Sequence, residues 1–480
     1  MSQNQNTAGR RFNLSRYIPY PAPTAAGQTG RRMAQKFFFP IPQRDHAPWK
    51  TKRQVIVSFC IFFCTMGLGN SWGVYQSYYE SNLLDSYSSS TISWIGTMQG
   101  FLLSLVGFFS GPLYDKGYVR SLFYIGSVLN VVGLLGTSFA TQYATIFLAF
   151  GVALGLGCGI LYVPAIALIS SHFEGQQAAL PTAIAMSGSS MGGIVYPILF
   201  RRLIEEIGFS SAGQVLTAIN GGLLLISCLL VLPKKEGETI AGGTTGESPT
   251  TLQGLLHSFK ALLEWKLVLF GGCAMLMNFG IDVPFYYIPT FVSEQLKQPP
   301  EVGASLLTGL NASSLFGRLA LNWLSEHTKP LLIWQFTILI TGLLLFLWFT
   351  IKNFAEIIIF VICYGFVDGG LISLIAPSLK ELYPDDDSSF GAQLGIVEGL
   401  QGVGFLVGPP IAGAILASPA GYFGVSLFNG TLFMVIFLLV GIFFTRKHFA
   451  RPKKKEPGEE ILLEPQTQGS TEAVMRRRSV

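Results

Sequence analysis

The chain has 480 residues, of which half are hydrophobic and only 12% are charged. A water-soluble chain of this length would fold into two or three domains with charged faces every few helical turns, and this composition excludes that class. Nearly uncharged stretches of about 20 residues recur along the chain, and each is long enough to cross roughly 30 Å of hydrocarbon as a helix. The sequence therefore predicts an all-α polytopic membrane protein.

Twelve apolar windows follow one another along the chain. The first six cover 54–78, 92–112, 121–139, 145–169, 179–200 and 215–232, and the last six cover 267–291, 304–324, 331–350, 357–376, 394–417 and 425–445. A stretch rich in Gly, Thr and charge separates the two sets at 233–265 and has the composition of a linker. We therefore expect twelve transmembrane helices in two pseudo-symmetric six-helix bundles, over 54–232 and 266–445, with tails at 1–53 and 446–480.

The distribution of basic residues predicts the orientation of the chain. Lys and Arg stay on the cytoplasmic side of a membrane because moving them across it is costly. With the N-terminus inside, all but five of the 32 basic residues are cytoplasmic; the five are Arg201, Arg202, Lys297, Arg318 and Lys352. We predict cytoplasmic termini and, first, a plasma-membrane location. The first 44 residues contain seven cations and no acid, a bias shared with mitochondrial targeting segments, so a mitochondrial or vacuolar membrane stays open.

The two halves align with each other at an offset of about 212 residues, which indicates an internal duplication. The matching pairs are Asn70 with Asp282, Asp115 with Glu326, Pro164 with Pro377, and Pro197 with Pro409. Duplicated membrane units place the substrate site near the midplane between the halves. Glycine and proline within the spans fit either a rocking interface or tight static packing.

Four ionisable residues fall inside the predicted spans, and all of them belong to the second half. They are Asp282, Arg318, Asp368 and Glu398. Such a side chain costs about 2.5–3.5 kcal/mol at midspan, so we interpret these four as functional. We expect Arg318 to pair with Asp368 or Glu398, and the remaining acid to carry a coupled proton. The alternative is a purely structural bridge between Arg318 and an acid.

Amides and aromatic residues gather near the outer end of the first span of each half. The candidates are Asn70, Tyr75 and Gln76 in the first span and Asp282 and Tyr286 in the seventh. We predict that these side chains bind the substrate together with Arg318. Aromatic residues at this depth are also ordinary interface anchors, and that alternative stays open for the tyrosines.

No pattern in the sequence indicates a metal, a cofactor or a nucleic-acid partner. The five histidines lie outside the predicted spans, and no span carries His or acidic clusters at metal-binding or nucleophile spacing. A Walker-type Gly-Lys-Ser/Thr run is also missing from the sequence. We therefore expect energy from a gradient, no metal and no cofactor, and partners limited to the lipid bilayer and a small-molecule substrate.

Several segments carry a family resemblance. They are GPLYDKGYVR at 111–120, NSWGVYQSYY in span one, HFEGQQAALPTAIAMSGSSMGG entering span five, VPFYYIPTF in span seven and LLTGLNASSLFGRLALNWL in span eight. From about residue 49 to 445 the chain resembles the major facilitator superfamily and, within it, the fungal branch of the monocarboxylate porter family. The resemblance implies the major facilitator fold, a monomer, and a gating loop that controls the inner gate through Gly111, Asp115, Gly117 and Arg120. A plain reverse turn uses similar residues.

The chain also departs from the animal members of that family. Asn70 stands where they have a lysine that binds proton and anion, and Ser314 stands where they have an acid one turn before Arg318. Gly175, Gln176 and Gln177 replace basic residues. These differences argue against simple monocarboxylate–proton symport. Arg318 can still meet an anionic substrate, because guanidinium pairs strongly with carboxylate.

These observations together predict a secondary active transporter that works by alternating access. Its cargo is a small organic metabolite or organic anion that crosses a fungal membrane, with or without proton coupling. Uptake of a small acid and export of a secondary metabolite both stay open. The alternative from another class is a nutrient sensor of the same fold that does not transport, and we do not expect an enzyme.

Overall fold

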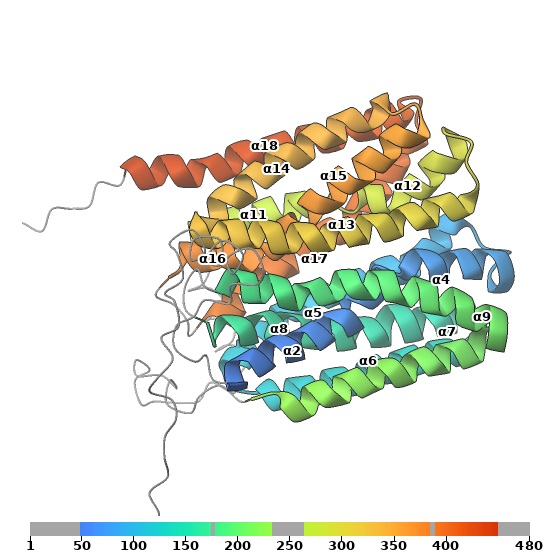
Figure 1. Cartoon of the computed structure of the whole chain (residues 1–480), viewed down its shortest axis with the longest axis horizontal. Coiled ribbons are helices and arrows are strands. Elements are labelled where there is room, and N and C mark those ends of the chain that lie inside the picture. The colour runs from blue at the N-terminus through green and yellow to red at the C-terminus, as the bar shows by residue number, and fades with distance from the viewer. Residues whose placement is uncertain (1–48, 174–177, 233–263, 385–388, 450–480) are drawn as a thin grey trace, which may run out of the picture.

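The computed structural model describes residues 49–173, 178–232, 264–384 and 389–449, and these residues form helices joined by short turns. The helices lie side by side in two bundles, one built from α2 to α9 and the other from α11 to α18 (Figure 1). Most of the predicted tails and of the predicted linker falls outside the described residues, as do Gly175, Gln176 and Gln177, whereas residues 49–53 and 446–449 of the predicted tails are helical.

The first bundle follows the predicted spans in chain order. Its helices are α2 (Trp49–Cys64), α3 (Met66–Gly69), α4 (Trp72–Tyr78), α5 (Ser89–Asp115), α6 (Val119–Phe139), α7 (Tyr143–Ile146), α8 (Gly155–Ser170) and α9 (Ala179–Leu230). A π-helical segment extends α4 over Tyr79–Leu83, and a second one joins α7 to α8 over Phe147–Leu154.

The second bundle repeats this plan. Its helices are α11 (Trp265–Asn278), α12 (Val283–Glu294), α13 (Pro300–His327), α14 (Pro330–Leu347), α15 (Phe354–Ser373), α16 (Ile375–Leu382), α17 (Phe390–Leu416) and α18 (Gly421–Phe449). We call the end of the molecule where α2 begins and α18 ends the terminal end, on the left in Figure 1, and the opposite end the distal end.

Ten helices within the described residues are long and apolar enough to cross a membrane. One of them, α9, has 52 residues and measures about 78 Å along its axis, too long for one crossing. It breaks at Gly208, whose φ of 78° is open to glycine and costly for other residues. With α9 counted as two crossings and the more polar 28-residue α13 added, the described helices match the predicted spans one for one.

The first long helix of each bundle is interrupted at equivalent positions. Asn70 lies in the turn between α3 and α4, and Asp282 lies in the turn between α11 and α12. The duplicated sequence pairs these two residues. Breaks in a membrane helix leave backbone groups that need a polar neighbour or a water-filled cavity. Both breaks therefore point to a site that the two bundles share.

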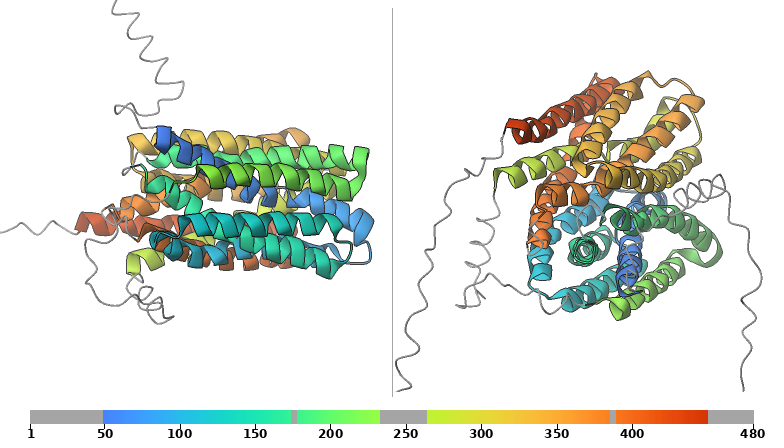
Figure 2. Two further views of the ribbon diagram at one scale, coloured as in Figure 1. Left: turned by 90° about the horizontal axis from the view of Figure 1, so that it is seen from below. Right: turned by 60° about the vertical axis from the view of Figure 1, so that its left-hand side comes forward.

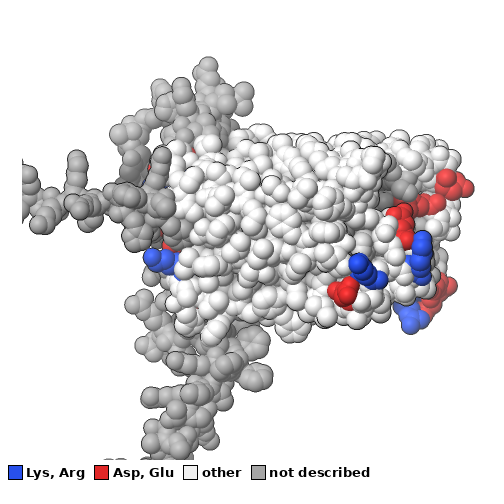
Figure 3. Space-filling model, turned by 90° about the horizontal axis from the view of Figure 1, so that it is seen from above, with Lys and Arg blue, Asp and Glu red and all other residues white. Residues whose placement is uncertain are grey.

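The sides of the molecule are apolar. Figure 3 shows charged residues gathered at the distal end and, more sparsely, beside the terminal end, with a broad uncharged zone between them. Large apolar side chains are exposed on the helices, such as Leu229 at 72% and Leu438 at 68%. In water such a surface would be costly, whereas in lipid tails it is the expected one.

Glycines bring α5 and α17 into contact at the terminal end. A Cβ on Gly111 would overlap the carbonyl of Gly391, and a Cβ on Gly395 would lie 2.8 Å from the carbonyl of Gly107. Further toward the distal end, side chains separate the same two helices, and the Phe405 ring lies against Gly100. The two bundles therefore touch backbone to backbone at the terminal end. Figure 2 shows them as two groups of helices, blue to green and yellow to red, that meet side by side.

Candidate transport site

A cavity of about 520 Å³ lies between the two bundles. Its lining includes Asn70, Trp72, Gln76, Gln99, Tyr162, Asn278, Asp282, Phe285, Tyr286, Asn311, Ser314, Arg318, Asp368, Glu398, Gln401 and Phe405. Seven of the eight predicted substrate-binding and proton-coupling residues therefore meet in one space, although they come from α4, α12, α13, α15, α17 and the two helix breaks.

Arg318 occupies the deep part of this cavity and is only 2% exposed. Its Nη1 donates to the Met186 carbonyl of the opposite bundle at 3.3 Å, and its Nε donates to Ser314 Oγ at 3.5 Å. The Ser314 hydroxyl in turn donates to Asp368 Oδ2 at 3.2 Å. Within the described residues, no carboxylate oxygen lies within 4 Å of the guanidinium. The predicted direct ion pair is wrong for this conformation, because Ser314 stands between the two charged groups.

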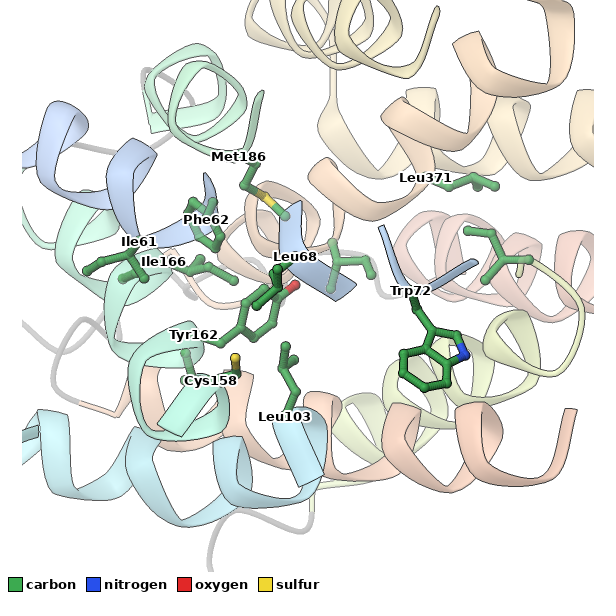
Figure 4. Close-up of a cluster of buried hydrophobic side chains, with 14 of the residues drawn as sticks. Ile61, Phe62, Leu68, Trp72, Leu103, Cys158, Tyr162, Ile166, Met186 and Leu371 are labelled. Carbon is green, nitrogen blue, oxygen red and sulfur yellow. The ribbon is translucent and has the colours of Figure 1, made fainter. Parts of the chain in front are cut away.

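Glu398 also faces the cavity, from α17, and is 5% exposed. Tyr162 of α8 lies close enough to interact electrostatically with both Glu398 and Arg318. Figure 4 shows the Tyr162 ring directed from α8 toward Leu68 and Leu103, into the space between the helices. Acid and base thus share one buried region without a direct pair, which leaves room for a charged or hydrogen-bonding ligand between them.

Closer to the distal end the lining is made of amides and aromatic rings. Asn70 Nδ2 donates to Asn311 Oδ1 across the two bundles at 3.4 Å. On α4, Trp72 Nε1 donates to Gln76 Oε1 at 2.8 Å, and Gln76 Nε2 donates to Glu80 Oε1 at 2.9 Å. This chain of hydrogen bonds holds the Gln76 amide at the cavity wall.

Tyr75 is the one predicted binding residue that the structure keeps away from the cavity. Its ring is 2% exposed and packs against Phe150 and Phe200, with centroids 5.5 and 4.0 Å away. Its neighbour Gln76 points to the cavity because successive residues of a helix face about 100° apart. The ring therefore packs inside the first bundle, away from both the cavity and the membrane interface that the alternative for the tyrosines implied.

The predicted gating loop lies at the terminal end. Asp115, the last residue of α5, accepts hydrogen bonds from the backbone N–H groups of Gly391 at 3.1 Å and Ala392 at 2.7 Å. These donors belong to the first turn of α17 in the opposite bundle, where unpaired N–H groups and the helix dipole favour an anion. Gly117 adopts a φ of 91° that allows the following turn. Arg120 is exposed and has no partner among the described residues.

Glu326 makes the equivalent contact from the second bundle. Its Oε1 accepts the backbone N–H of Leu180, in the first turn of α9, at 3.0 Å. Sequence reasoning paired Glu326 with Asp115 through the repeat but did not assign it to the gate. The repeat was the signal that would have found it, since a duplicated acid at the end of an equivalent helix meets an equivalent helix start.

The cavity opens toward the distal end and is closed at the terminal end. Distal lining residues such as Ser77 and Arg201 are exposed, whereas Arg318, Asp368 and Glu398 are at most 5% exposed. Between these residues and the terminal end lie the contact of α5 with α17 and the two acid caps, which are the contacts of Asp115 with α17 and of Glu326 with α9. A central site that is open at one end and sealed at the other is the geometry of one state of an alternating-access carrier.

Comparison with known proteins decides the family. The sequence profile of the Major Facilitator Superfamily matches residues 57–386 and 328–478. The chain belongs to the Major Facilitator Superfamily. The MFS-type transporter pynF of Aspergillus niger is 32% identical to this transporter over 399 residues, covering 82% of this chain and 88% of pynF. The aspyridones efflux protein apdF of Emericella nidulans is 30% identical over 375 residues, covering 78% and 73%.

Solved structures support the fold. The human organic anion transporter TETRAN aligns with a TM-score of 0.67 at 13% identity, covering 82% of this chain and 100% of that structure. The Escherichia coli fucose:proton symporter aligns with a TM-score of 0.60 at 15% identity, covering 81% and 98%. The protein is thus a secondary active transporter for a small molecule, embedded in a membrane by many helices, and not an enzyme. The nutrient-sensor alternative finds no support among these relatives.

Proposed function

We propose that this transporter exports an acidic organic metabolite across the plasma membrane, together with a proton. Both termini would then lie in the cytoplasm, and the cavity would face outward in the described conformation. The efflux role in the name of the relative apdF favours export. A metabolite made inside the cell has a higher concentration there, so export can run down the gradient of the cargo itself.

The observation that carries the proposal is the incompletely paired guanidinium of Arg318. Its Nε and Nη1 bond to neutral oxygens, and its Nη2 has no hydrogen-bond partner among the described residues. The Asp368 carboxylate reaches the guanidinium only through Ser314, and a buried cation without a direct anionic partner is costly. A carboxylate or enolate of the cargo would supply that anion and could bind through two parallel hydrogen bonds.

Proton coupling follows from the charges that surround Arg318. Asp282, Asp368 and Glu398 line the same cavity. If all three were ionised, they would outnumber the guanidinium and repel an anionic cargo. Protonation of Asp368 and Glu398 would remove that repulsion, so proton and anion binding favour each other and travel in the same direction. This arrangement fits the monocarboxylate porter branch, although the coupling acids lie on other helices than in the animal members of that branch. A single copy of the chain contains all of these residues, so a monomer can carry out transport.

Deletion of the gene in the source organism tests the proposal and reveals the cargo at the same time. We expect an acidic metabolite to accumulate in the cells and to decline in the medium, and wild-type protein to restore its release. The Arg318→Ala variant, made to the same level in the membrane, should not restore it. An unchanged distribution of acidic metabolites in the deletion strain, or full rescue by Arg318→Ala, would contradict the proposal.

A further inference from the structure

Two glycines of α5 seat aromatic rings from both bundles. Gly96 and Gly100 are one helical turn apart and line the cavity. A Cβ at Gly96 would lie 2.6 Å from Cγ of Trp72, and a Cβ at Gly100 would overlap the Phe405 ring. Because neither glycine has a side chain, both rings rest against the α5 backbone and form part of the cavity wall. We call Trp72 and Phe405 the aromatic wall.

The two rings differ in how many contacts they make within the protein. Trp72 is 5% exposed, packs on Phe150 with centroids 5.0 Å apart, and donates its N–H to Gln76. Phe405 is partly exposed to the cavity and has no ring partner among the described residues. Packing within the protein therefore explains the position of Trp72, whereas Phe405 presents a ring that a ligand can cover.

Two amide donors flank the aromatic wall. Gln99 lies between the two glycines on α5, and Gln401 lies one turn before Phe405 on α17; both line the cavity and are at most 5% exposed. Asn278 Nδ2 donates to Gln401 Oε1 at 2.8 Å, which directs the Gln401 Nε2 group elsewhere. In the described part of the chain, neither Gln99 Nε2 nor Gln401 Nε2 makes a well-formed hydrogen bond. Gln401 lies near the Glu398 carboxyl group, and Gln99 lies near the Cys158 thiol. Buried donors whose hydrogen bonds are incomplete are costly, and an oxygen of the cargo would relieve that cost.

We infer that the cargo carries a flat aromatic or conjugated ring with an oxygen acceptor, which stacks on the aromatic wall and accepts hydrogen bonds from Gln99 and Gln401. The inference rests on the proposed function, because the ring belongs to the molecule whose acidic group meets Arg318. Contacts between aromatic rings stabilise beyond the area they bury. A saturated ring of the same carbon skeleton should therefore bind about tenfold more weakly.

Binding of two matched acids to the purified full-length protein in lipid nanodiscs tests the ring. The probes are naphthoate and its saturated counterpart decahydronaphthoate, followed by calorimetry. We expect naphthoate to bind about tenfold more tightly, and Phe405→Leu to bring the two affinities close together while decahydronaphthoate binding changes little. Equal affinities in the wild-type protein, or binding of neither acid, would overturn the aromatic subsite. Export in the deletion strain is a separate measurement, so the proposed function can stand if the subsite falls.

A pair of glycine variants separates the subsite from general packing. Gly100→Ala should push the Phe405 ring into the cavity and weaken naphthoate binding about fivefold or more, since the contact is with a side chain that can turn. Gly272→Ala is the matched control, because no atom lies near the added methyl group, and its affinity should equal that of the wild type. Unchanged binding in Gly100→Ala would contradict the placement of the ring.

The amide donors are tested with a hydroxylated probe. Hydroxynaphthoate should bind more tightly than naphthoate to the wild-type protein, because its oxygen can accept from Gln99 or Gln401. The advantage should disappear in the double variant Gln99→Leu, Gln401→Leu. If the hydroxyl group does not raise the affinity in the wild type, or if it still does so in the double variant, Gln99 and Gln401 do not donate hydrogen bonds to an oxygen of the cargo.

Discussion

The two bundles share one helix plan but contribute different chemistry to the cavity. The first bundle lines the deep part with neutral groups, such as Gln99 and Tyr162. The second bundle lines it with Arg318, Glu398 and two further acids. Charges on both facing walls would each need desolvation and a partner in hydrocarbon. With the deep Arg318, Asp368 and Glu398 on one wall, the facing wall is free to recognise the shape and rings of the cargo.

At the terminal end the same two bundles are alike. Asp115 caps the start of α17, and Glu326 caps the start of α9, each across the interface. A contact that must open and reform at each transport cycle benefits from polar bonds between backbone and acid, which water can replace once the interface opens. Duplication thus kept the gate symmetric while the centre of the cavity diverged.

The largest expected effect comes from the buried charge of the second bundle. Arg318→Ala should lower export at least about 30-fold, because truncation of a buried partner of a charged ligand costs several kcal/mol. Arg201→Ala is the matched control, since Arg201 lines the same cavity at its exposed mouth. Flux of the metabolite found in the deletion strain is the measurement. Equal losses of export in the two variants would contradict the assignment of the essential buried charge to the second bundle.

The buried acids should separate coupling from binding. In vesicles, a gradient of one pH unit can drive up to about tenfold accumulation of a cargo that moves with one proton. We expect Glu398→Gln and Asp368→Asn to lose this pH-driven accumulation while exchange of labelled for unlabelled cargo continues. That exchange is the control, because it reports in the same vesicles that each variant is folded. Unchanged pH dependence in both variants would end the assignment of a proton to either acid.

The symmetric gate should respond more to Asp115 than to Glu326. Asp115→Asn weakens an acceptor of two backbone N–H groups and should raise the population open at the terminal end about fivefold. Glu326→Gln affects one N–H group, and burial already raises the pKa of the Glu326 carboxyl and so disfavours its charged form. Labelling of a cysteine placed at Ala167, which is buried beside Asp115, measures the opening. A larger effect from Glu326→Gln would reverse this ranking.

The smallest expected effect is at Tyr75. Its hydroxyl is buried without a hydrogen-bond partner among the described residues and lies away from the cavity. Tyr75→Phe should therefore leave export within about twofold of the wild type, because removal of an unpaired buried hydroxyl is nearly neutral. Tyr162→Phe, at a tyrosine that does line the cavity, is the comparison. A loss of export confined to Tyr75→Phe would restore Tyr75 as a binding residue.

Much of the site could be predicted because hydrocarbon penalises charge inside a span, most strongly near its middle. Asp282, Arg318, Asp368 and Glu398 stood out for that reason, and all four line one cavity. The sequence could not tell whether Tyr75 or Gln76 faces the cavity, because the two residues are neighbours in one aromatic cluster. The orientation of α4 about its own axis decides which of them does. The bridging role of Ser314 was not predicted. The resemblance marked Ser314 only as the place of a missing acid, and a serine in a span costs little free energy.

Sequence alone determined the class of protein, the order of the helices and the repeat, because the length and apolarity of each span follow from local composition and the thickness of a bilayer. Only the tertiary structure decided which side chains meet. The Ser314 bridge, the two acid caps and the seating of Phe405 on Gly100 all join helices that lie far apart along the chain. Their distances depend on how helices pack within a bundle, for the Ser314 bridge, and between the bundles, for the other contacts.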